Sequence, residues 1–438
     1  MIAQVTNPKN MHKAYQQVFR NHGSAGMDGM RVSDLLPYVR EHRGEVIVAL
    51  KEGRYQVQPI LGVNIPKSNG KKRLLGIPTV KDRWLQQCVL QTIALHFETE
   101  FMAHSYGFRP NKNALQCVQQ SKEYIHEGYQ HIVDIDLKNF FDEVNHCELL
   151  ELLFAKVKCP ITLRLIRKWL RAPILIDGKL TKRRKGVPQG SPLSPLLSNI
   201  MLHELDKELT QQGLKYVRYA DDFSIYCKSK SESRKTEHKI HLFLRDKLKL
   251  EVNLEKSGIR KPVDFSILGY EYVPTYEKGT KGRYQLVVSA KGWKRVKEQL
   301  KMITRKTSPI TLTERIRRIK EVQQGWLNYF RLASIHGKLK LLDSWLRNRL
   351  RYCIWHDWKK PERKRKNLMR LGVPKGNAYA WSRTRMGGWR VAQSPILTTT
   401  ITLSRLKQRG YVAMLDTYLR ITPQLNEPLY TRPVRTVV

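Results

Sequence analysis

The chain has 438 residues with 80 Lys+Arg and 38 Asp+Glu, so its formal charge is +42 at pH 7 and its isoelectric point is about 10.1. This balance indicates a polyanionic partner, and a hydrophobic content of 41% excludes wholesale disorder. No apolar run approaches the roughly 18–20 residues of a membrane span, and the N-terminus has no apolar signal core. We therefore expect a soluble, unexported protein of two or three domains.

The six cysteines are scattered along the chain and form none of the close C-x₂-C pairs that are typical of zinc sites. A disulfide framework would also need closer spacings or an exporting context. We expect reduced thiols and no zinc.

The first part of the chain alternates between helical patterns and short strands. Residues 1–50 are predicted to be helical, with a break in the glycine-rich segment 21–29. A β-hairpin is expected next, with strands at 57–66 and 73–78 and with three lysines and an arginine between and beside them. Residues 80–128 have a helical pattern.

The next segment, 131–137, is apolar, has the length of a strand, and carries the carboxylates Asp134 and Asp136. Two helical stretches follow. The segment 183–192, which is rich in Arg, Gly and Pro, interrupts them and is expected to be a loop.

The most informative segment is 216–227, where aromatic and β-branched residues surround the adjacent pair Asp221 and Asp222. This pattern predicts a β-hairpin with the two acids at its tip. Two neighbouring ionised carboxylates repel each other, so a divalent cation is the natural compensation. The alternative is a solvated turn, which is the usual place for an isolated Asp-Asp pair.

A third carboxylate, from the strand at 131–137, would complete an oxygen-rich site for two Mg²⁺ ions. Two metal ions about 4 Å apart can polarise an attacking 3′-hydroxyl and stabilise a leaving pyrophosphate. That chemistry is nucleotidyl transfer. The basic hairpin from Lys67 to Arg73 would then neutralise the incoming triphosphate.

The last third of the chain is the most basic part, because residues 281–438 hold 36 basic and 8 acidic residues. Seven of the nine tryptophans also lie there, which suits phosphate neutralisation combined with base stacking. For Trp326, Trp345 and Trp355 we favour a place in helix cores. The charge is spread over folded segments and forms no membrane-anchoring cluster, so nucleic acid is the expected partner. Charge does not distinguish RNA from DNA.

The ordered series of motifs closely resembles the reverse transcriptases encoded by bacterial group II introns, over nearly the whole chain. Segment 21–29 is similar to the family's N-terminal loop, and 65–79 is similar to its fingers hairpin. The further matching segments are 105–110, 136–142 (motif A), 186–195 (motif B), 219–222 (motif C), 250–257, 265–270 (primer grip) and 325–330 (maturase signature).

The resemblance implies a catalytic set. Four residues would bind the metal ions: Asp136, Leu137, Asp221 and Asp222. Asp134 competes with Asp136, because a period of two puts both on one strand face. We choose Asp136, because the family's metal-binding Asp lies five residues before an aromatic residue, here Phe141. Lys256 would protonate the leaving pyrophosphate, and its alternative is a solvated lysine.

The resemblance also implies substrate contacts. Phe141 would be the steric gate that excludes a ribose 2′-hydroxyl, and its alternative is a plain core phenylalanine. Gln189 would contact the template or the nucleotide through its amide. Lys67 and Arg73 would hold the triphosphate, and Arg109 would be a further substrate-binding residue.

The implied fold is a right-hand polymerase of the α+β class, with an antiparallel palm sheet and an α-helical thumb. The expected regions are an N-terminal extension (1–55), fingers and palm (56–280), a thumb or maturase domain (285–360) and a basic C-terminal nucleic-acid-binding region (361–438). Nothing resembles the cysteine-bearing endonuclease domain of many family members, so the chain is similar to the endonuclease-lacking type.

The implied function is RNA-directed DNA synthesis coupled to binding of the parent group II intron RNA, whose splicing the protein would assist and which it would copy during retrohoming. The expected cofactor is Mg²⁺, two ions, with Mn²⁺ as a substitute. The expected partners are intron RNA, a DNA target and primer strand, and deoxynucleoside triphosphates, in the bacterial cytoplasm and at the nucleoid when on DNA. Two rivals stay open: a splicing factor with an inactive polymerase, and a reverse transcriptase domesticated for DNA repair or defence.

Overall fold

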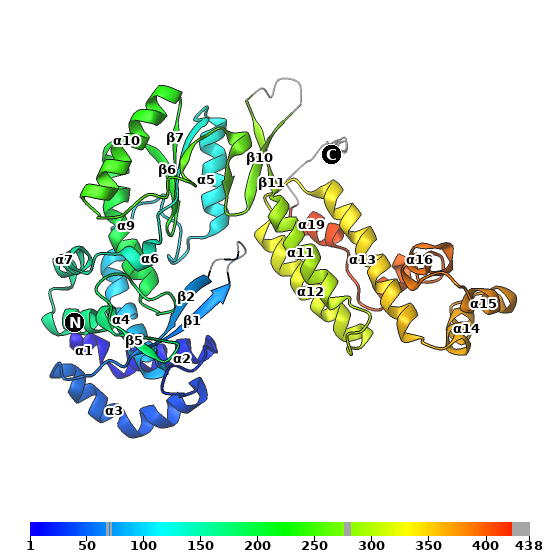
Figure 1. The fold of residues 1–438 in the computed structure, drawn as a ribbon, viewed down its shortest axis with the longest axis horizontal. Coiled ribbons are helices and arrows are strands. Elements are labelled where there is room, and N and C mark those ends of the chain that lie inside the picture. The colour runs from blue at the N-terminus through cyan, green and yellow to red at the C-terminus, as the bar shows by residue number, and fades with distance from the viewer. Residues whose placement is uncertain (67–69, 71, 276–281, 423–438) are drawn as a thin grey trace. The chain divides into compact units, whose positions relative to one another are not determined.

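The computed structural model describes residues 1–66, 70, 72–275 and 282–422. The chain divides into two compact units, Met1–Lys261 and Pro262–Val438. The first unit combines helices with two four-stranded sheets, and the second has a three-stranded sheet followed by helices (Figure 1). The predicted α+β class is confirmed, as are the antiparallel palm sheet and the helical C-terminal region.

The first unit contains the following elements in chain order: α1 (Ile2–Val5), α2 (Pro8–Arg20), the 3₁₀ turn η1 (Val32–Asp34), α3 (Leu35–Lys51), β1 (Ile60–Pro66), β2 (Lys72–Ile77), α4 (Val80–Glu98), α5 (Ala114–His126), β3 (His131–Ile135), α6 (Phe140–Glu143), α7 (His146–Val157), α8 (Pro160–Arg171), β4 (Ile174–Ile176), β5 (Lys179–Thr181), α9 (Ser194–Gln211), β6 (Lys215–Tyr219), β7 (Asp222–Cys227), α10 (Lys230–Asp246) and β8 (Gly258–Arg260).

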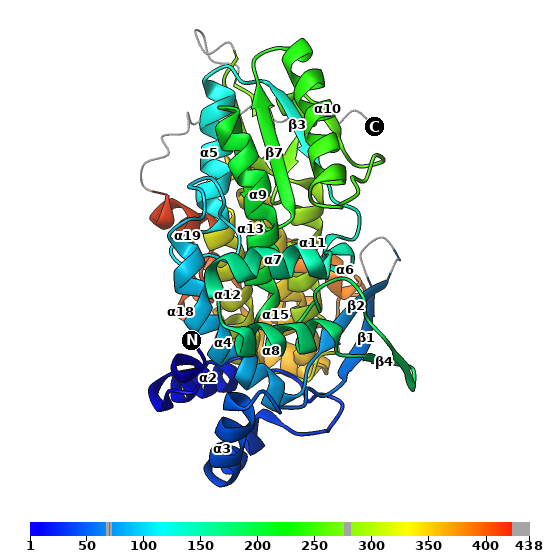
Figure 2. The same ribbon diagram turned by 90° about the vertical axis from the view of Figure 1, so that its left-hand side faces the viewer.

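The palm sheet has the strand order β6-β7-β3-β8, and all neighbouring strands are antiparallel. Helices α5, α9 and α10 pack against it (Figure 2). The apolar residues that predicted these strands are buried, with Val133 and Ile225 at 0% exposure. Burying both strands in this way stabilises the sheet and fixes its register, because a slip by one residue would expose every apolar side chain.

The fingers sheet has the order β2-β1-β4-β5. The predicted hairpin strands are present as β1 and β2, which pair antiparallel from Leu61 and Ile77 to Pro66 and Lys72. Most of the predicted turn lies outside the described residues. Sequence reasoning missed β4 and β5, because strands of three residues are too short to show a period.

One long predicted helix is in fact two. The pattern at 80–128 divides into α4, which ends at Glu98, and α5, which begins at Ala114. Asn113 is the N-cap of α5: its side chain accepts from the amide of Gln116, while the Gln116 side chain accepts from the amide of Asn113. This reciprocal capping box satisfies two amides at the helix start and fixes the boundary there.

The second unit contains η2 (Pro262–Asp264), β9 (Ser266–Ile267), β10 (Tyr270–Pro274), β11 (Tyr284–Val288), α11 (Ala290–Ile303), α12 (Leu312–Tyr329), α13 (His336–Asp357), α14 (Pro361–Arg370), α15 (Lys375–Ser382), α16 (Gly388–Gln393), α17 (Pro395–Thr398), α18 (Leu403–Gln408) and α19 (Met414–Ile421). The sheet order is β11-β10-β9. Trp355 is buried as expected, whereas Trp326 and Trp345 are half-buried. Across both units, no helix among the described residues is long and apolar enough to cross a membrane.

Candidate active site

The strands of the palm sheet bring the predicted carboxylates to one edge. Asp221 lies in the turn between β6 and β7, and Asp222 is the first residue of β7. Asp136 directly follows β3, whose last residue, Ile135, pairs with Phe223 of β7. The antiparallel register therefore puts Asp136 opposite Asp222. The two acids predicted at a hairpin tip are found there.

The three acids influence one another electrostatically. The pKa of Asp222 is raised to about 6 by the protein that surrounds the carboxyl and then by the charges of Asp221, Asp136 and Asp134. This happens although Asp222 is an exposed residue. Burial also raises the pKa of Asp221, where Asp136 adds to the effect and Arg73 opposes it. The site therefore holds more negative charge than the protein compensates.

The alternative carboxylate, Asp134, has a different partner. Its Oδ2 accepts from Nε of Arg260 at 2.9 Å. Asp136 instead contacts Lys256, whose Nζ lies 2.7 Å from Asp136 Oδ2. Lys256 is thus brought to the carboxylates, and this hydrogen bond raises its pKa. Both carboxylates thus have a basic partner, and Asp136 is the one that follows β3 opposite the start of β7.

A cavity of about 590 Å³ in the first unit gathers predicted substrate residues from separate elements. Arg73 comes from β2, Phe141 from α6, and Gln189 from the loop that precedes α9. The electrostatic effect of Arg73 on Asp221 relates this cavity to the carboxylates.

Backbone contacts hold the loop of Gln189 against the fingers sheet. The carbonyl of Gln189 accepts from the amide of Gly76 at 2.8 Å. Gly190 has φ +122°, and a Cβ there would lie 2.6 Å from the carbonyl oxygen of Gly76. Only glycine permits this approach and this backbone conformation.

Phe140 and Phe141 have different surroundings. Phe140 is 1% exposed and belongs to the core, whereas Phe141 is half-buried and lines the cavity. Their rings meet edge to face with centroids 5.3 Å apart. Phe141 also packs against the hydrophobic core, so both interpretations of Phe141, steric gate and core phenylalanine, stay open.

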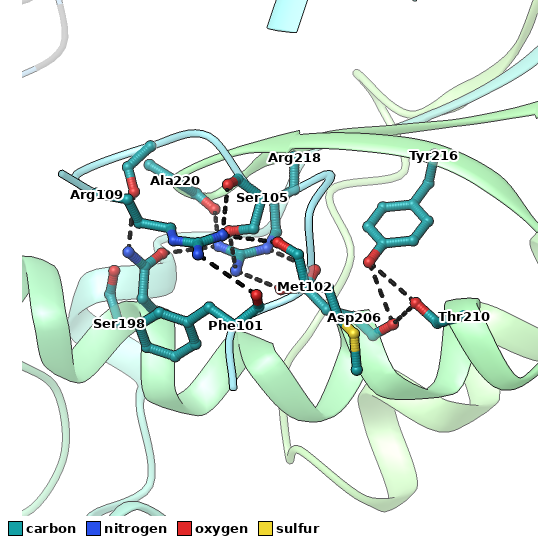
Figure 3. Close-up of polar contacts among 12 residues, drawn as sticks. Phe101, Met102, Ser105, Arg109, Ser198, Asp206, Thr210, Tyr216, Arg218 and Ala220 are labelled. Carbon is teal, nitrogen blue, oxygen red and sulfur yellow. Dashed lines mark hydrogen bonds and ion pairs between the residues drawn. The ribbon is translucent and has the colours of Figure 1, made fainter. Parts of the chain in front are cut away.

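The structure does not place Arg109 among the residues that line the cavity. Its guanidinium donates to Glu98 Oε1 at 2.9 Å. It also donates to the carbonyls of Met102 and Ser105, at 2.7 and 2.9 Å (Figure 3). The side chain is only 6% exposed. These hydrogen bonds hold together the loop that follows α4. They occupy the guanidinium, so no pair of donors is directed at a substrate, and Arg109 has a structural role here.

Two other predicted residues are less well defined. Lys67 lies outside the described residues. Leu137 forms an isolated bridge with Val252. In this bridge the carbonyl of Asp136 accepts from the amide of Asn253, and the amide of Lys138 donates to the carbonyl of Glu251. The bridge therefore uses the carbonyl of Asp136 rather than that of Leu137.

The carboxylates suit a cation by their chemistry. Within the parts of the chain that the structure describes, no three His, Cys, Asp or Glu side chains are arranged as a ready set of metal ligands. The ammonium of Lys256 is the cation that Asp136 contacts. Burial and then the charges of Asp221 and Asp136 raise the pKa of Asp222. Three carboxylates at one edge are nevertheless a donor set that a hard divalent ion fits.

Sequence reasoning missed several residues of the cavity. Arg83 and Gln87 of α4, Phe108, and Asn21 and Gly23 of the N-terminal loop also line it. Arg83 is 8% exposed and donates to the carbonyl of Ser24, so it joins the loop to α4. The sequence signal for these residues was the glycine-rich loop. A Cβ at Gly23 would lie 2.1 Å from the Arg83 guanidinium, so the close contact between loop and arginine depends on glycine.

Comparison with known proteins gives two family matches. Residues 65–272 match the family described as reverse transcriptase (RNA-dependent DNA polymerase). Residues 293–372 match the group II intron, maturase-specific domain.

The chain is also similar to individual proteins. The chain is 31% identical over 332 residues to the group II intron-encoded protein LtrA of Lactococcus lactis subsp. cremoris, covering 60% of this chain and 55% of that protein. It is 28% identical over 314 residues to protein YkfC of Escherichia coli (strain K12), covering 62% and 82%. The chain thus spans about half the length of the Lactococcus relative. A solved chain of a partial Cas6-RT-Cas1–Cas2 complex aligns at a TM-score of 0.37 and 25% identity, over 56% of this chain and 42% of that chain.

Proposed function

We propose, from the premise that the chain belongs to the group II intron-encoded reverse transcriptases with a maturase-specific domain, that it is an RNA-directed DNA polymerase. It also binds its group II intron RNA, assists splicing and copies the intron into DNA during retrohoming. The observation that carries the polymerase assignment is a carboxylate edge whose member Asp221 interacts electrostatically with Arg73, which lines a cavity together with Phe141 and Gln189.

Each group has a role in nucleotide addition. Asp136, Leu137, Asp221 and Asp222 would hold two Mg²⁺, which would supply activation of the primer 3′-hydroxyl and neutralisation of the pyrophosphate. Mn²⁺, with the same preference for oxygen ligands, would substitute.

The chain's own side chains bind and orient the nucleotide. Arg73, together with Lys67, neutralises the triphosphate, since a guanidinium forms paired, charge-assisted hydrogen bonds with phosphate oxygens. Phe141 forms the wall beside the sugar, and Gln189 contacts the nucleotide or template through its amide. Lys256, held beside Asp136, donates a proton to the leaving pyrophosphate.

The second unit supports the RNA-binding part of the proposal. Its maturase-specific match covers residues 293–372, and residues 281–438 hold 36 basic against 8 acidic residues. Phosphate contacts from such a surface bind a folded RNA backbone and stabilise its compact form.

The test is cDNA synthesis combined with RNA binding by the purified chain. A DNA primer annealed to an RNA template should be extended with deoxynucleotides, and a group II intron RNA should bind more tightly than an unrelated folded RNA of equal length. Intron affinity without cDNA would assign the chain to splicing alone. Synthesis without intron preference would favour a domesticated reverse transcriptase.

A further inference from the structure

A fully buried ion pair lies behind the carboxylate hairpin. Arg218 of β6 and Asp206 of α9 are both 0% exposed, and the Arg218 guanidinium meets both carboxylate oxygens, at 2.8 and 2.5 Å. Arg218 precedes Asp221 by three residues. Figure 3 shows its guanidinium enclosed between the hairpin, the loop of Ser105 and α9.

The remaining donors of Arg218 bind three further parts of the palm. One nitrogen donates to Asn199 Oδ1 and to the carbonyl of Ala220, both at 2.9 Å, and another donates to Ser105 Oγ at 2.7 Å. Ala220 belongs to the turn itself and has φ +59°, which is unusual for a residue with a Cβ. The guanidinium thus fixes a strained turn directly beside Asp221.

The opposite side of the turn is also held. A Cβ at Gly107 would lie 2.3 Å from the amide nitrogen of Ala220, so only glycine allows this approach. The carbonyl of Gly107 accepts from Asn199 Nδ2 at 2.9 Å, and Asn199 in turn accepts from Arg218. Ser105, Gly107, α9 and the turn therefore form one connected network around Arg218.

Stability of the fold does not by itself require a buried ion pair at this position. Buried ion pairs can often be replaced by apolar residues of similar volume without loss of stability. What apolar residues cannot supply is a rigid fork that fixes several acceptors at set angles. We propose that Arg218 is a positioning residue, which holds the turn so that Asp221 and Asp222 face Asp136 in the geometry needed for the reaction. This inference rests on the proposed function of those carboxylates.

The test compares Arg218→Lys with the double variant Arg218→Met/Asp206→Leu, which removes both charges and restores apolar packing. Three quantities are measured: thermal unfolding, binding of Mn²⁺ followed by electron paramagnetic resonance of the free ion, and steady-state primer extension. Both variants should bind Mn²⁺ several-fold more weakly. Their kcat should fall on the order of 100-fold, the effect of misplacing reacting groups by about 1 Å, whereas KM for the deoxynucleotide should change little.

A matched control is Arg315→Lys. Arg315 is also 0% exposed, and it donates to the carbonyls of Ile303, Arg305 and Ser308 in the second unit. This variant should lower thermal stability and leave Mn²⁺ affinity unchanged. If Arg218→Lys fails to fold, the Mn²⁺ affinity and the kcat of the double variant test the inference.

Two results overturn the inference. One is a folded double variant with wild-type Mn²⁺ affinity and kcat, and the other is an equal loss in the Arg315 control. A wild-type chain that binds Mn²⁺ but extends no primer would contradict the proposed function instead, and the comparison of Mn²⁺ affinities would still decide the place of Arg218.

Discussion

The ammonium of Lys256 lies 2.7 Å from Oδ2 of Asp136, although the two residues are 120 positions apart in the chain. The lysine side chain is 64% exposed, so charge rather than packing holds it there. The contact raises the pKa of Lys256, which therefore stays protonated at neutral pH. A proton donor is thus kept at the carboxylate edge.

Replacing Lys256 tests this donor directly. Lys256→Gln should slow single-turnover nucleotide addition about 100-fold, the usual size of a general-acid effect, with little change in deoxynucleotide affinity. Lys138→Gln is the control, because Lys138 is an exposed lysine paired with Glu251 at 3.1 Å. Equal rates for wild type and Lys256→Gln would show that Lys256 is a solvated lysine with no part in the reaction.

The raised pKa of Asp222 predicts how the stability of the folded chain depends on pH. Its pKa in the folded chain is raised to about 6, above that of an unfolded Asp, so the folded form loses stability as pH rises from about 4 through 6. In buffer with EDTA, Asp222→Asn should therefore raise the melting temperature at pH 8 and leave it unchanged at pH 3.5.

The control for this measurement has the opposite shift. The pKa of Asp246 is lowered by its hydrogen bond with Arg245. Asp246→Asn should accordingly give no gain at pH 8. A gain for Asp246→Asn as large as that for Asp222→Asn would contradict the crowding of charge at the hairpin.

The sugar gate can be tested with a pair of neighbours. Phe141→Ala should increase ribonucleotide incorporation relative to deoxyribonucleotide, because it removes a wall of the cavity. Phe140→Ala should leave this ratio unchanged and instead cost about 3–5 kcal/mol of unfolding free energy, since it empties a core position. Competition assays with both nucleotide types measure the ratio, and an exchange of the two phenotypes would shift the assignment to Phe140.

Helix α14 carries the basic run predicted to bind nucleic acid, but its members differ. Lys364 Nζ lies 4.3 Å from the ring centroid of Trp355, and burial lowers its pKa. Changing Arg363, Arg365 and Lys366 together to Gln should weaken the dependence of RNA affinity on salt. In a plot of log affinity against log salt concentration, the slope should fall by somewhat under one for each phosphate contact that is lost. Filter binding from about 50 to 500 mM salt measures it.

Lys364→Gln should act differently from that triple variant. It should lower the unfolding free energy by about 1 kcal/mol through the lost cation–π contact and change the salt slope less. An unchanged slope in the triple variant would make this face of α14 an ordinary solvated surface.

Much of the site follows from local sequence. The strand period around Asp221 and Asp222 predicts their hairpin, whereas the choice of Asp136 as the third acid follows from the family resemblance and not from the local pattern. The hairpin signals are local because strand periodicity and turn chemistry act over a few residues.

The remainder depends on contacts between distant segments. Arg83 and Phe108 reach the cavity only through the packing of α4 and the loop after it. Arg109 looks like a substrate arginine in sequence, yet nearby carbonyls take up its donors. Nothing in the sequence marks Arg218 as the centre of a buried network, since its partners Ser105, Asn199 and Asp206 become neighbours only in the fold.

The central claim is that the hairpin carboxylates catalyse RNA-templated DNA synthesis. Addition of one deoxynucleotide to a DNA primer annealed to RNA should be measured for wild type and for Asp221→Asn, with binding of the same primer–template measured in parallel. We predict that the variant loses at least about 1000-fold in rate, the scale on which removal of a metal-ion effect is felt, while its affinity stays within about twofold because phosphate contacts supply it. Wild-type extension by Asp221→Asn, with equal binding, would contradict the account.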